Sequence, residues 1–338
     1  MKRVRSTAAI SKVEGGGNYF AAPKAGLSFI GSGCKTLDLA LGGGWAEGRI
    51  FNIVGDKSTG KTLLCIEAAA NFARKYPEGI IRYAECEAAF DPEYAGALGM
   101  PVERVDFGKA FETVEDLFEE LTKLTTEPKQ PVLYFCDSLD ALSDRAEMDR
   151  DIDEGTYGAE KAKKMSQLFR RLVQKMAVAK LTLGIVSQVR SKIGMTFGGR
   201  TTSRSGGRAL DFYASQVLYL AQTGTTKKTV GGITRKTGIE ILAKMDKNKV
   251  GLPYREASFE IAFGYGIDDI AACLNWLDTA GHLNDVGVAK KDIKKATKDI
   301  MKLDDAAFKA EVDRIHAATE KRWYEIEQSF MPTRRKYA

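Results

Sequence analysis

The segment from Gly55 to Thr62 carries the most specific chemical pattern in the sequence. Its letters, GDKSTGKT, fit GxxxxGK[ST], in which a glycine-rich loop turns backbone N–H groups toward phosphate oxygens. Lys61 is expected to reach the β- and γ-phosphates of a nucleotide, and the Thr62 hydroxyl is expected to bind Mg²⁺. The same phosphate site is predicted to include the rest of the loop, Asp56, Lys57, Ser58, Thr59 and Gly60.

Acidic residues near such a loop would complete a nucleotide-hydrolysing site. Asp137 directly follows an apolar run at 132–136, where an acid can hold Mg²⁺ through water. Glu85 and Glu87 lie at the end of another apolar run, 80–86, and either carboxylate could orient the attacking water. Spacing alone does not choose between these two glutamates.

A parallel sheet would bring these residues together. Short apolar runs alternate with amphipathic stretches, which predicts the α/β class, with a mostly parallel twisted sheet flanked by helices. Two later runs, 217–221 and 240–243, are divided by shorter polar turns, so we expect them to extend the sheet in antiparallel fashion. The predicted strands are 49–54, 80–86, 132–136 and 181–187, and the predicted helices are 62–76, 113–125 and 159–179.

The 338 residues are expected to form three parts. Hydrophobic residues make up 44% of the chain and charged residues 28%, which is ordinary for a globular protein with a real core. Residues 1–27 are polar and glycine-rich and predict an N-terminal arm that could contact another subunit. Residues 28–267 predict the α/β core, and 268–338 predict a small helical C-terminal domain with one long helix at 306–328.

Composition excludes several other classes of protein. The five cysteines form no CxxC pair and there are only two histidines, so the supply of ligands argues against a zinc site and a histidine-based nucleophile. Reduced thiols favour a cytoplasmic location, and no apolar run is long enough to predict a membrane span or a secretory leader. The net charge of +6 permits an anionic partner without requiring one.

Further motifs, taken in order with the phosphate loop, resemble the bacterial RecA recombinase family. The resemblance covers roughly residues 28–267 and implies a P-loop RecA-like core. The residues that carry it are 84–95 (AECEAAFDPEYA), 136–142 (CDSLDAL), 164–167 (KMSQ), 187–194 (SQVRSKIG), 195–198 (MTFG), 206–215 (GGRALDFYAS) and 247–249 (KNK).

The resemblance assigns roles around the nucleotide. It implies that Glu87 is the catalytic glutamate and that Asp91 and Tyr94 contact adenine. A tyrosine ring also offers a flat face to a base on general grounds.

The resemblance also implies that three further residues link the nucleotide site to other parts of the assembly. The resemblance implies that Gln188 couples the nucleotide state to the loop that follows it. It also implies that Lys247 and Lys249 reach the ATP of a neighbouring subunit, where two cations would stabilise charge on the transferring phosphoryl group.

Two segments are predicted to bind DNA. The stretch 190–208 holds several cations, two apolar side chains and no acid, which suits a phosphate backbone and stacked bases: Arg190, Lys192, Met195, Phe197, Arg200, Arg204 and Arg208. The weaker candidate, 153–164, has mixed charge; its predicted contacts are Tyr157, Lys161, Lys163 and Lys164.

Some positions depart from the family pattern. The arm is short, Ala88 and Asp211 replace a common histidine and lysine, and the chain ends in the basic Arg334-Arg335-Lys336. These differences predict a divergent member of the family, of a kind that a phage could encode.

The resemblance implies an ATP-dependent recombinase that forms a helical filament on single-stranded DNA and exchanges strands with a homologous duplex. Loading proteins or single-strand-binding proteins would be further partners, and no membrane is expected. The alternative is a ring-shaped RecA-like DNA motor, such as a helicase or packaging-type ATPase, which should lack Gln188 combined with its glycine-rich loop and 247–249. A regulatory scaffold that binds ATP without hydrolysing it is a third interpretation, which Glu87 disfavours.

Overall fold

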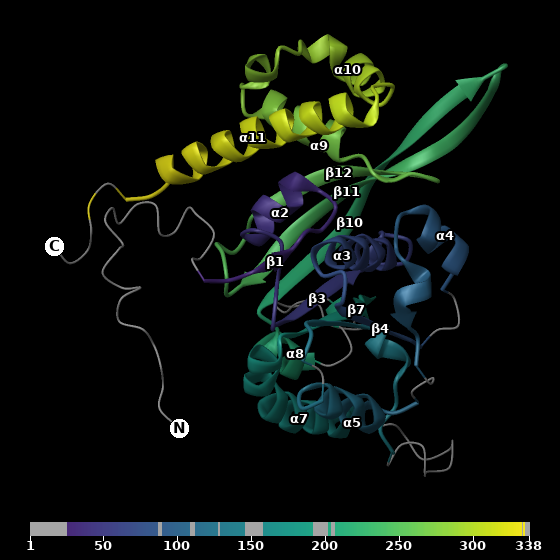
Figure 1. The fold of residues 1–338 in the computed structure, drawn as a ribbon, viewed down its shortest axis with the longest axis vertical. Helices are drawn as coiled ribbons and strands as arrows, with labels where there is room; N and C mark the ends of the chain where they lie inside the picture. Colours follow the sequence, from purple (N-terminus) through teal and green to yellow (C-terminus); the bar gives the residue numbers. More distant parts are fainter. Residues whose placement is uncertain are drawn as a thin grey trace.

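A nine-stranded sheet frames the part of the chain that the structure describes (Figure 1). The computed structural model describes residues 26–86, 90–108, 112–127, 129–145, 158–191, 202–203, 207–332 and 334. Almost the whole predicted N-terminal arm therefore lies outside the described residues.

The strand order is β13-β12-β11-β10-β3-β7-β6-β4-β5. Strands from β10 to β5 pair in parallel, whereas β10 to β13 pair antiparallel. This confirms the α/β class, the parallel sheet and its antiparallel extension. The strands are β3 (Ile50–Gly55), β4 (Ile80–Glu85), β5 (Val105–Asp106), β6 (Val132–Asp137), β7 (Leu181–Gln188), β10 (Gln216–Val230), β11 (Ile233–Asn248), β12 (Glu256–Ala262) and β13 (Gly266–Ile267).

Helices cover both faces of the sheet because every second side chain of a strand points to the same face. Phe51 and Ile53 pack in one hydrophobic core with α2 and α3, while Ile50 and Val54 pack in another with α5 and α7. The helices of these layers are α2 (Lys35–Leu41), α3 (Lys61–Lys75), α4 (Pro92–Ala97), α5 (Val114–Leu124), α7 (Gly158–Ala179) and α8 (Gly207–Tyr213). Minor elements are β1 (Phe29–Ile30), β2 (Trp45–Ala46), β8 (Arg190–Ser191), β9 (Thr202–Ser203), η2 (Val102–Arg104) and η3 (Leu139–Ala141).

The hairpin of β10 and β11 is much longer than the runs 217–221 and 240–243 predicted. Its outer half projects from the molecule as a two-stranded ribbon, joined by Gly231 and Gly232 at φ +57° and +80° (Figure 1). Positive φ at both central residues fits a tight hairpin turn, and glycine adopts it without strain. The ribbon lies largely outside the core, so its threonines and lysines give no apolar alternation, and the predicted strands were too short.

The C-terminal segment is helical, as expected, and has an apolar core of its own. Leu274 and Leu277 of α9 (Asp269–Thr279) pack with residues of α10 (Ile293–Ile300) and α11 (Asp305–Ser329). These helices, with η4 (Leu283–Val286) and η5 (Lys290–Asp292), lie above α2 and β12 in Figure 1. None of the helices that the structure describes is long and apolar enough to span a membrane.

Candidate nucleotide site

The carboxyl ends of four parallel strands meet where the sequence placed its chemical residues. Gly55 at the end of β3 is paired in register with Gln188 of β7, and Glu85 of β4 is paired with Asp137 of β6. Ligands of open parallel sheets bind outside this edge of the strands. The sheet therefore brings the phosphate loop, Gln188 and both acids to one edge.

The phosphate loop leaves the start of α3 open to an anion. Gly60, the residue before α3, has φ +85° and gives the helix no side-chain cap, and helix starts of this kind bind anions through their first N–H groups. Lys61 Nζ donates to the carbonyl oxygen of Asp56 at 2.6 Å, which holds the ammonium beside the loop. Thr59 Oγ1 donates to the same carbonyl at 2.9 Å, while Lys57 lies exposed. This arrangement fits a polyphosphate.

The predicted magnesium ligands are in direct contact. Thr62 Oγ1 donates to Asp137 Oδ2 at 2.8 Å, although the two residues are 75 positions apart in the chain. The Tyr83 hydroxyl donates to the same oxygen at 2.7 Å, and burial raises the pKa of Tyr83, so this donor stays protonated. A hydroxyl and a carboxylate are the oxygen ligands that Mg²⁺ prefers, so these residues fit the ion. Sequence reasoning missed Tyr83, whose only signal was its position within a strand ending at the site.

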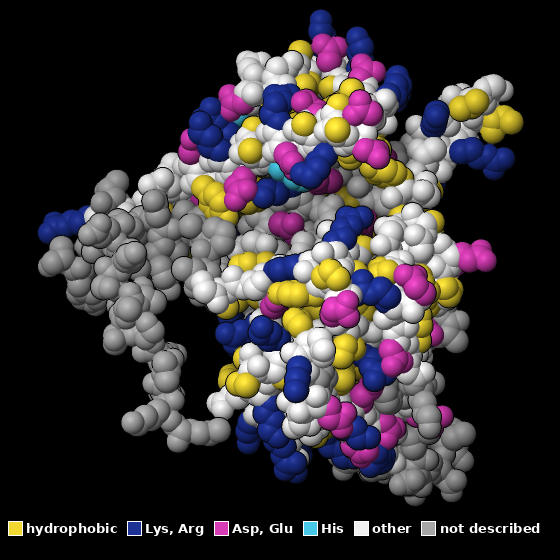
Figure 2. Space-filling model, in the orientation of Figure 1, with side chains coloured by type: hydrophobic (Ala, Val, Ile, Leu, Met, Phe, Trp, Pro, Cys, Tyr) yellow, Lys and Arg dark blue, Asp and Glu magenta, His cyan; other side chains and the backbone are white. Residues whose placement is uncertain are grey.

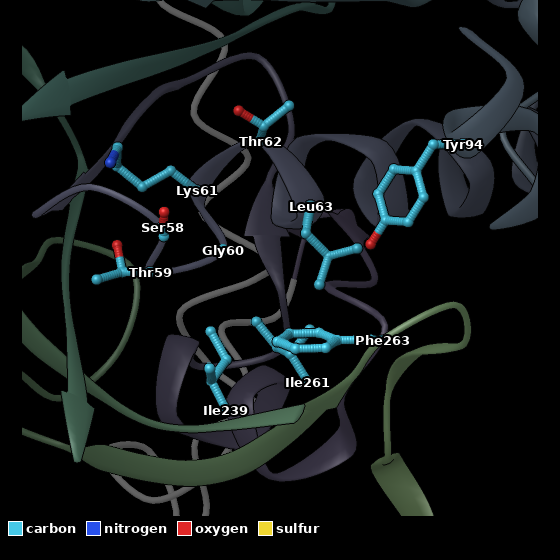
Figure 3. Close-up of a pocket in the computed structure, with 10 residues that line it drawn as sticks. All are labelled: Ser58, Thr59, Gly60, Lys61, Thr62, Leu63, Tyr94, Ile239, Ile261 and Phe263. Atoms are coloured by element: carbon cyan, nitrogen blue, oxygen red, sulfur yellow. The ribbon is translucent and has the colours of Figure 1, made fainter. Parts of the chain in front are cut away.

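A pocket of about 260 Å³ lies beside the loop (Figure 3). One side is the loop from Ser58 to Thr62, and the other side is apolar. The apolar side comprises Leu63, Tyr94, Ile239, Ile261 and Phe263. Tyr94 and Phe263 are 38% and 57% exposed, so both aromatic side chains can contact a flat, apolar group such as a base.

Asp91 positions the predicted base contact. It precedes α4, and its Oδ1 accepts a hydrogen bond from the backbone N–H of Tyr94 at 3.0 Å. The structure thus brings Tyr94 to the pocket and gives Asp91 a capping contact at the start of that helix. Ile239, Ile261 and Phe263 were missed, because they follow the loop by more than 170 residues and only the antiparallel half of the sheet brings them back.

The predicted catalytic glutamate, Glu87, lies outside the described residues, as does Ala88. Glu85, the other candidate, is half-buried beside Asp137 in the sheet register. The described residues therefore do not decide between Glu85 and Glu87, and the assignment of Glu87 as the catalytic residue stays an implication of the family resemblance.

Gln188 is held at the site through its backbone. Its N–H donates to Asp140 Oδ2 at 2.9 Å, and its neighbour Val189 donates to the carbonyl of Gly55 at 3.3 Å. The end of β7 is thus tied both to the phosphate loop and to the turn after β6. Beyond it, β8 pairs with β9, which closes the base of the predicted DNA-binding loop.

Lys247 and Lys249 do not line this chain's own pocket. Lys247 Nζ donates to the carbonyl oxygens of Asp211 and Phe212, the latter at 2.9 Å. Lys249 Nζ donates to the carbonyl of Phe212 at 3.1 Å and lies 5.7 Å from the centre of its ring. Both lysines sit beside α8 on the surface, where Phe212 is 69% exposed.

Most of the predicted DNA contacts cannot be placed. Tyr157, Lys192, Met195, Phe197, Arg200 and Arg204 lie outside the described residues. Lys161, Arg190 and Arg208 are placed only by the backbone of α7, β8 and α8. Lys163 is exposed, whereas Lys164 Nζ is paired with Glu115 at 2.7 Å and Asp144 at 3.2 Å, which ties α7 to α5.

Comparisons with known proteins agree with this geometry. The family model described as "RecA N-terminal domain" matches residues 9–268. The "Protein RecA" of Nostoc punctiforme is 36% identical over 252 residues, which cover 75% of this chain and 67% of that protein. The proteins of the same name from Prochlorococcus marinus and Trichodesmium erythraeum are 36% and 37% identical, covering 76% and 73% of this chain. The chain spans about two thirds of the length of these relatives, 66% for the latter two.

Proposed function

The chain belongs to the RecA family, and from this premise we propose that it is an ATP-dependent DNA recombinase. It would form a helical filament on single-stranded DNA and exchange strands with a homologous duplex. The observation that carries the proposal is the joined site itself: a phosphate loop, the Thr62–Asp137 pair and an apolar pocket wall around one sheet edge. Residues 28–267 would form the ATPase core, and 268–338 a C-terminal domain with its own hydrophobic core.

The chain's own residues would bind and orient ATP. The N-terminus of α3 and Lys61 would hold the phosphates, and Tyr94 and Phe263 would flank the base. Thr62 and Asp137 would hold Mg²⁺, which neutralises the negative charge that develops on the phosphate oxygens. Glu87 would accept the proton of the attacking water as general base.

Contacts beyond the pocket would link hydrolysis to DNA. The N–H of Gln188 is anchored by Asp140 between the phosphate loop and the 190–208 loop, so a shift at the γ-phosphate would move the start of that loop. Lys247 and Lys249 would contact the ATP of an adjacent subunit, because their own pocket lies elsewhere on the sheet. Loading or single-strand-binding proteins, and a cytoplasmic setting, complete the proposal.

The first experiment is ATP hydrolysis with and without single-stranded DNA. We expect single strands to stimulate hydrolysis, and Lys61→Ala to lower the stimulated rate by about a hundredfold, because Lys61 is the loop lysine held beside the phosphate site by the Asp56 carbonyl. Lys298→Ala, on the exposed face of α10, is the matched control and should behave as wild type.

A second assay separates a recombinase from a ring-shaped motor. Homologous circular single strands and linear duplex should yield joint molecules in the presence of ATP. Unwinding of a forked duplex with no joint molecules would overturn the recombinase proposal, and hydrolysis indifferent to DNA would do the same.

A further inference from the structure

Three side chains that can ligate a metal meet where the C-terminal helices join the core. Asp269 and Cys273 lie one turn apart on α9, and His316 faces them from α11. A carboxylate oxygen, the Sγ atom and an imidazole nitrogen all lie within 4.8 Å of one another. His316 Nε2 lies 2.5 Å from Asp269 Oδ2, and Cys273 Sγ lies 3.7 Å from Asp269 Oδ1. We call these three residues the α9–α11 cluster.

One side of the cluster is buried and the other side is partly exposed to solvent. Cys273 is fully buried, whereas the side chains of Asp269 and His316 are 20% and 29% exposed. An ion could therefore enter past the carboxylate and imidazole and meet the thiol at the inner end.

The carboxylate is oriented from the core. The backbone N–H of Lys35, at the start of α2, donates to Asp269 Oδ1 at 2.6 Å. The Lys35 ammonium is directed elsewhere, to Glu320 Oε2 at 2.7 Å. Within the described ranges, no Lys or Arg side chain is paired with Asp269, so its carboxylate is contacted by the imidazole, the Cys273 thiol and one backbone N–H. Such outer hydrogen bonds orient ligands in known metal sites.

We propose that the α9–α11 cluster binds one Zn²⁺ ion, with Asp269, Cys273 and His316 as protein ligands and water in the fourth position. One sulfur, one nitrogen and one oxygen suit the borderline character of Zn²⁺, which takes four ligands in tetrahedral geometry. Mg²⁺ does not suit the cluster, because it prefers a shell of oxygen ligands. Sequence spacing hides this site, since 42 residues separate Cys273 from His316.

The ion would act as a structural clamp. Its ligands belong to α9 and α11, and the N–H that orients Asp269 belongs to α2, so binding would tie the C-terminal helices to each other and to the core. Trp276 of α9 and Trp323 of α11 lie with ring centres 5.3 Å apart, so their fluorescence reports on the same contact.

Cobalt titration of the metal-free, reduced full-length protein tests the proposal. Co²⁺ replaces Zn²⁺ in tetrahedral sites, and a bound thiolate gives a charge-transfer absorption band. We expect one equivalent of band-forming Co²⁺ per chain, displaced by Zn²⁺, and a Zn²⁺-dependent rise in melting temperature. Cys273→Ser should abolish the band, and His316→Gln should weaken Zn²⁺ binding at least tenfold.

The other histidine supplies a matched control. His282 Nδ1 lies 3.9 Å from Asp285 Oδ2, a histidine–carboxylate pair outside the cluster, so His282→Gln should titrate as wild type. A wild-type protein that shows no thiolate band at saturating Co²⁺ would overturn the proposal without reference to any variant. A band that survives in folded Cys273→Ser, judged by circular dichroism, would overturn it too.

Discussion

One oxygen atom of Asp137 accepts hydrogen bonds from two hydroxyl groups, of Thr62 and of Tyr83. Thr62 is a predicted magnesium ligand, whereas Tyr83 is buried behind the carboxylate and can only orient it. Removing an orienting contact of this kind commonly lowers metal affinity by roughly tenfold to a hundredfold. Tyr83→Phe should therefore raise the Mg²⁺ concentration needed for half-maximal hydrolysis by about tenfold, with a smaller effect on the rate at saturating Mg²⁺.

The matched control for this prediction is Tyr134→Phe. Tyr134 is equally buried on the neighbouring strand, and its hydroxyl donates to Glu120 Oε2 at 2.7 Å, away from the nucleotide edge. Both variants lose one buried hydrogen bond, worth about 1 kcal/mol of unfolding free energy. An equal shift in Mg²⁺ dependence for both would show that Tyr83 acts only through stability.

Tyr94 is expected to bind the nucleotide through its ring. Tyr94→Phe keeps the ring and should bind ATP as wild type does. Tyr94→Ala removes a contact of about 1–1.5 kcal/mol, so the dissociation constant should rise roughly tenfold. Isothermal titration with a non-hydrolysable ATP analogue measures both. Equal losses in the two variants would instead assign the contact to the hydroxyl.

Asp38 predicts a pH dependence of stability. Asp38 is half-buried, its Oδ1 accepts a hydrogen bond from the N–H of Ser32 at 2.8 Å, and loss of contact with water raises the pKa of this carboxyl from 3.8 to about 7. The folded state keeps this proton to higher pH than the unfolded state, so the free energy of unfolding falls as pH rises from 3.8 to about 7. Asp38→Asn lacks this term. Its stability relative to wild type should therefore increase across that window and then level off, as urea unfolding at several pH values would show. A stability difference between Asp38→Asn and wild type that does not change with pH would contradict the prediction. Asp299→Asn, at an exposed position, is the control.

The projecting hairpin sets like charges against each other. In the strand register, Lys227 lies opposite Lys236, and Lys228 lies opposite Arg235. The sequence from 222 to 239 contains no acidic residue. Figure 2 shows this ribbon with dark blue and hydrophobic side chains at the upper right. Like charges directly opposite each other destabilise a strand pair, by roughly 0.2–1 kcal/mol. Lys227→Glu should slow amide hydrogen exchange in the outer ribbon, by less at high salt.

An opposite-charge pair on the same strand provides the contrast. Lys244 is paired with Glu256 across β11 and β12, with Nζ 2.8 Å from Oε1. Lys244→Glu would place two like charges opposite each other, whereas Lys227→Glu removes such a pair. Amide hydrogen exchange around Lys244 should therefore become faster. Unchanged exchange in both variants would mean that screening already cancels these pairings.

The parallel half of the fold could be predicted from the sequence, whereas the antiparallel half could not. Buried parallel strands are short apolar runs, and those predicted at 80–86, 132–136 and 181–187 match β4, β6 and β7 within one residue at either end. The β10–β11 ribbon and β12 carry exposed polar faces, so the same criterion shortened the first and missed the second.

The candidate site divides in the same way. Motif residues such as Lys61, Thr62 and Asp137 are brought together as the sequence predicted, because the loop and the strand ends carry them locally. The apolar wall could not be predicted, since Ile261 and Phe263 reach the pocket only through the order of the strands. The α9–α11 cluster depends likewise on how two distant helices pack.

At the scale of the whole molecule, a partly buried ion pair ties the end of α11 to the core. Arg255, beside β12, donates from Nε to Glu327 Oε1 at 2.6 Å and from Nη2 to Oε2 at 2.5 Å, and Glu327 is 8% exposed. Glu327→Gln removes the charge and keeps the shape, so it should cost about 1.5–3 kcal/mol and expose α11 to limited proteolysis. Glu325→Gln is the control, because the Glu325 side chain is 46% exposed where it pairs with Arg322. Equal proteolysis of the two variants would show that the pair does not hold the helix.

Strand β11 carries Ile239 in the wall of this chain's pocket and Lys247 eight residues further along, roughly 27 Å away. It is paired with β10 from Ile233 to Asn248 and with β12 from Gly238 to Lys244, which favours a stiff rod between the two positions. In the proposed filament, one end of this rod would touch the subunit's own nucleotide and the other would touch its neighbour's. Occupancy of one site would then be transmitted mechanically to the next. Hydrolysis should accordingly rise with ATP concentration more steeply than independent sites allow.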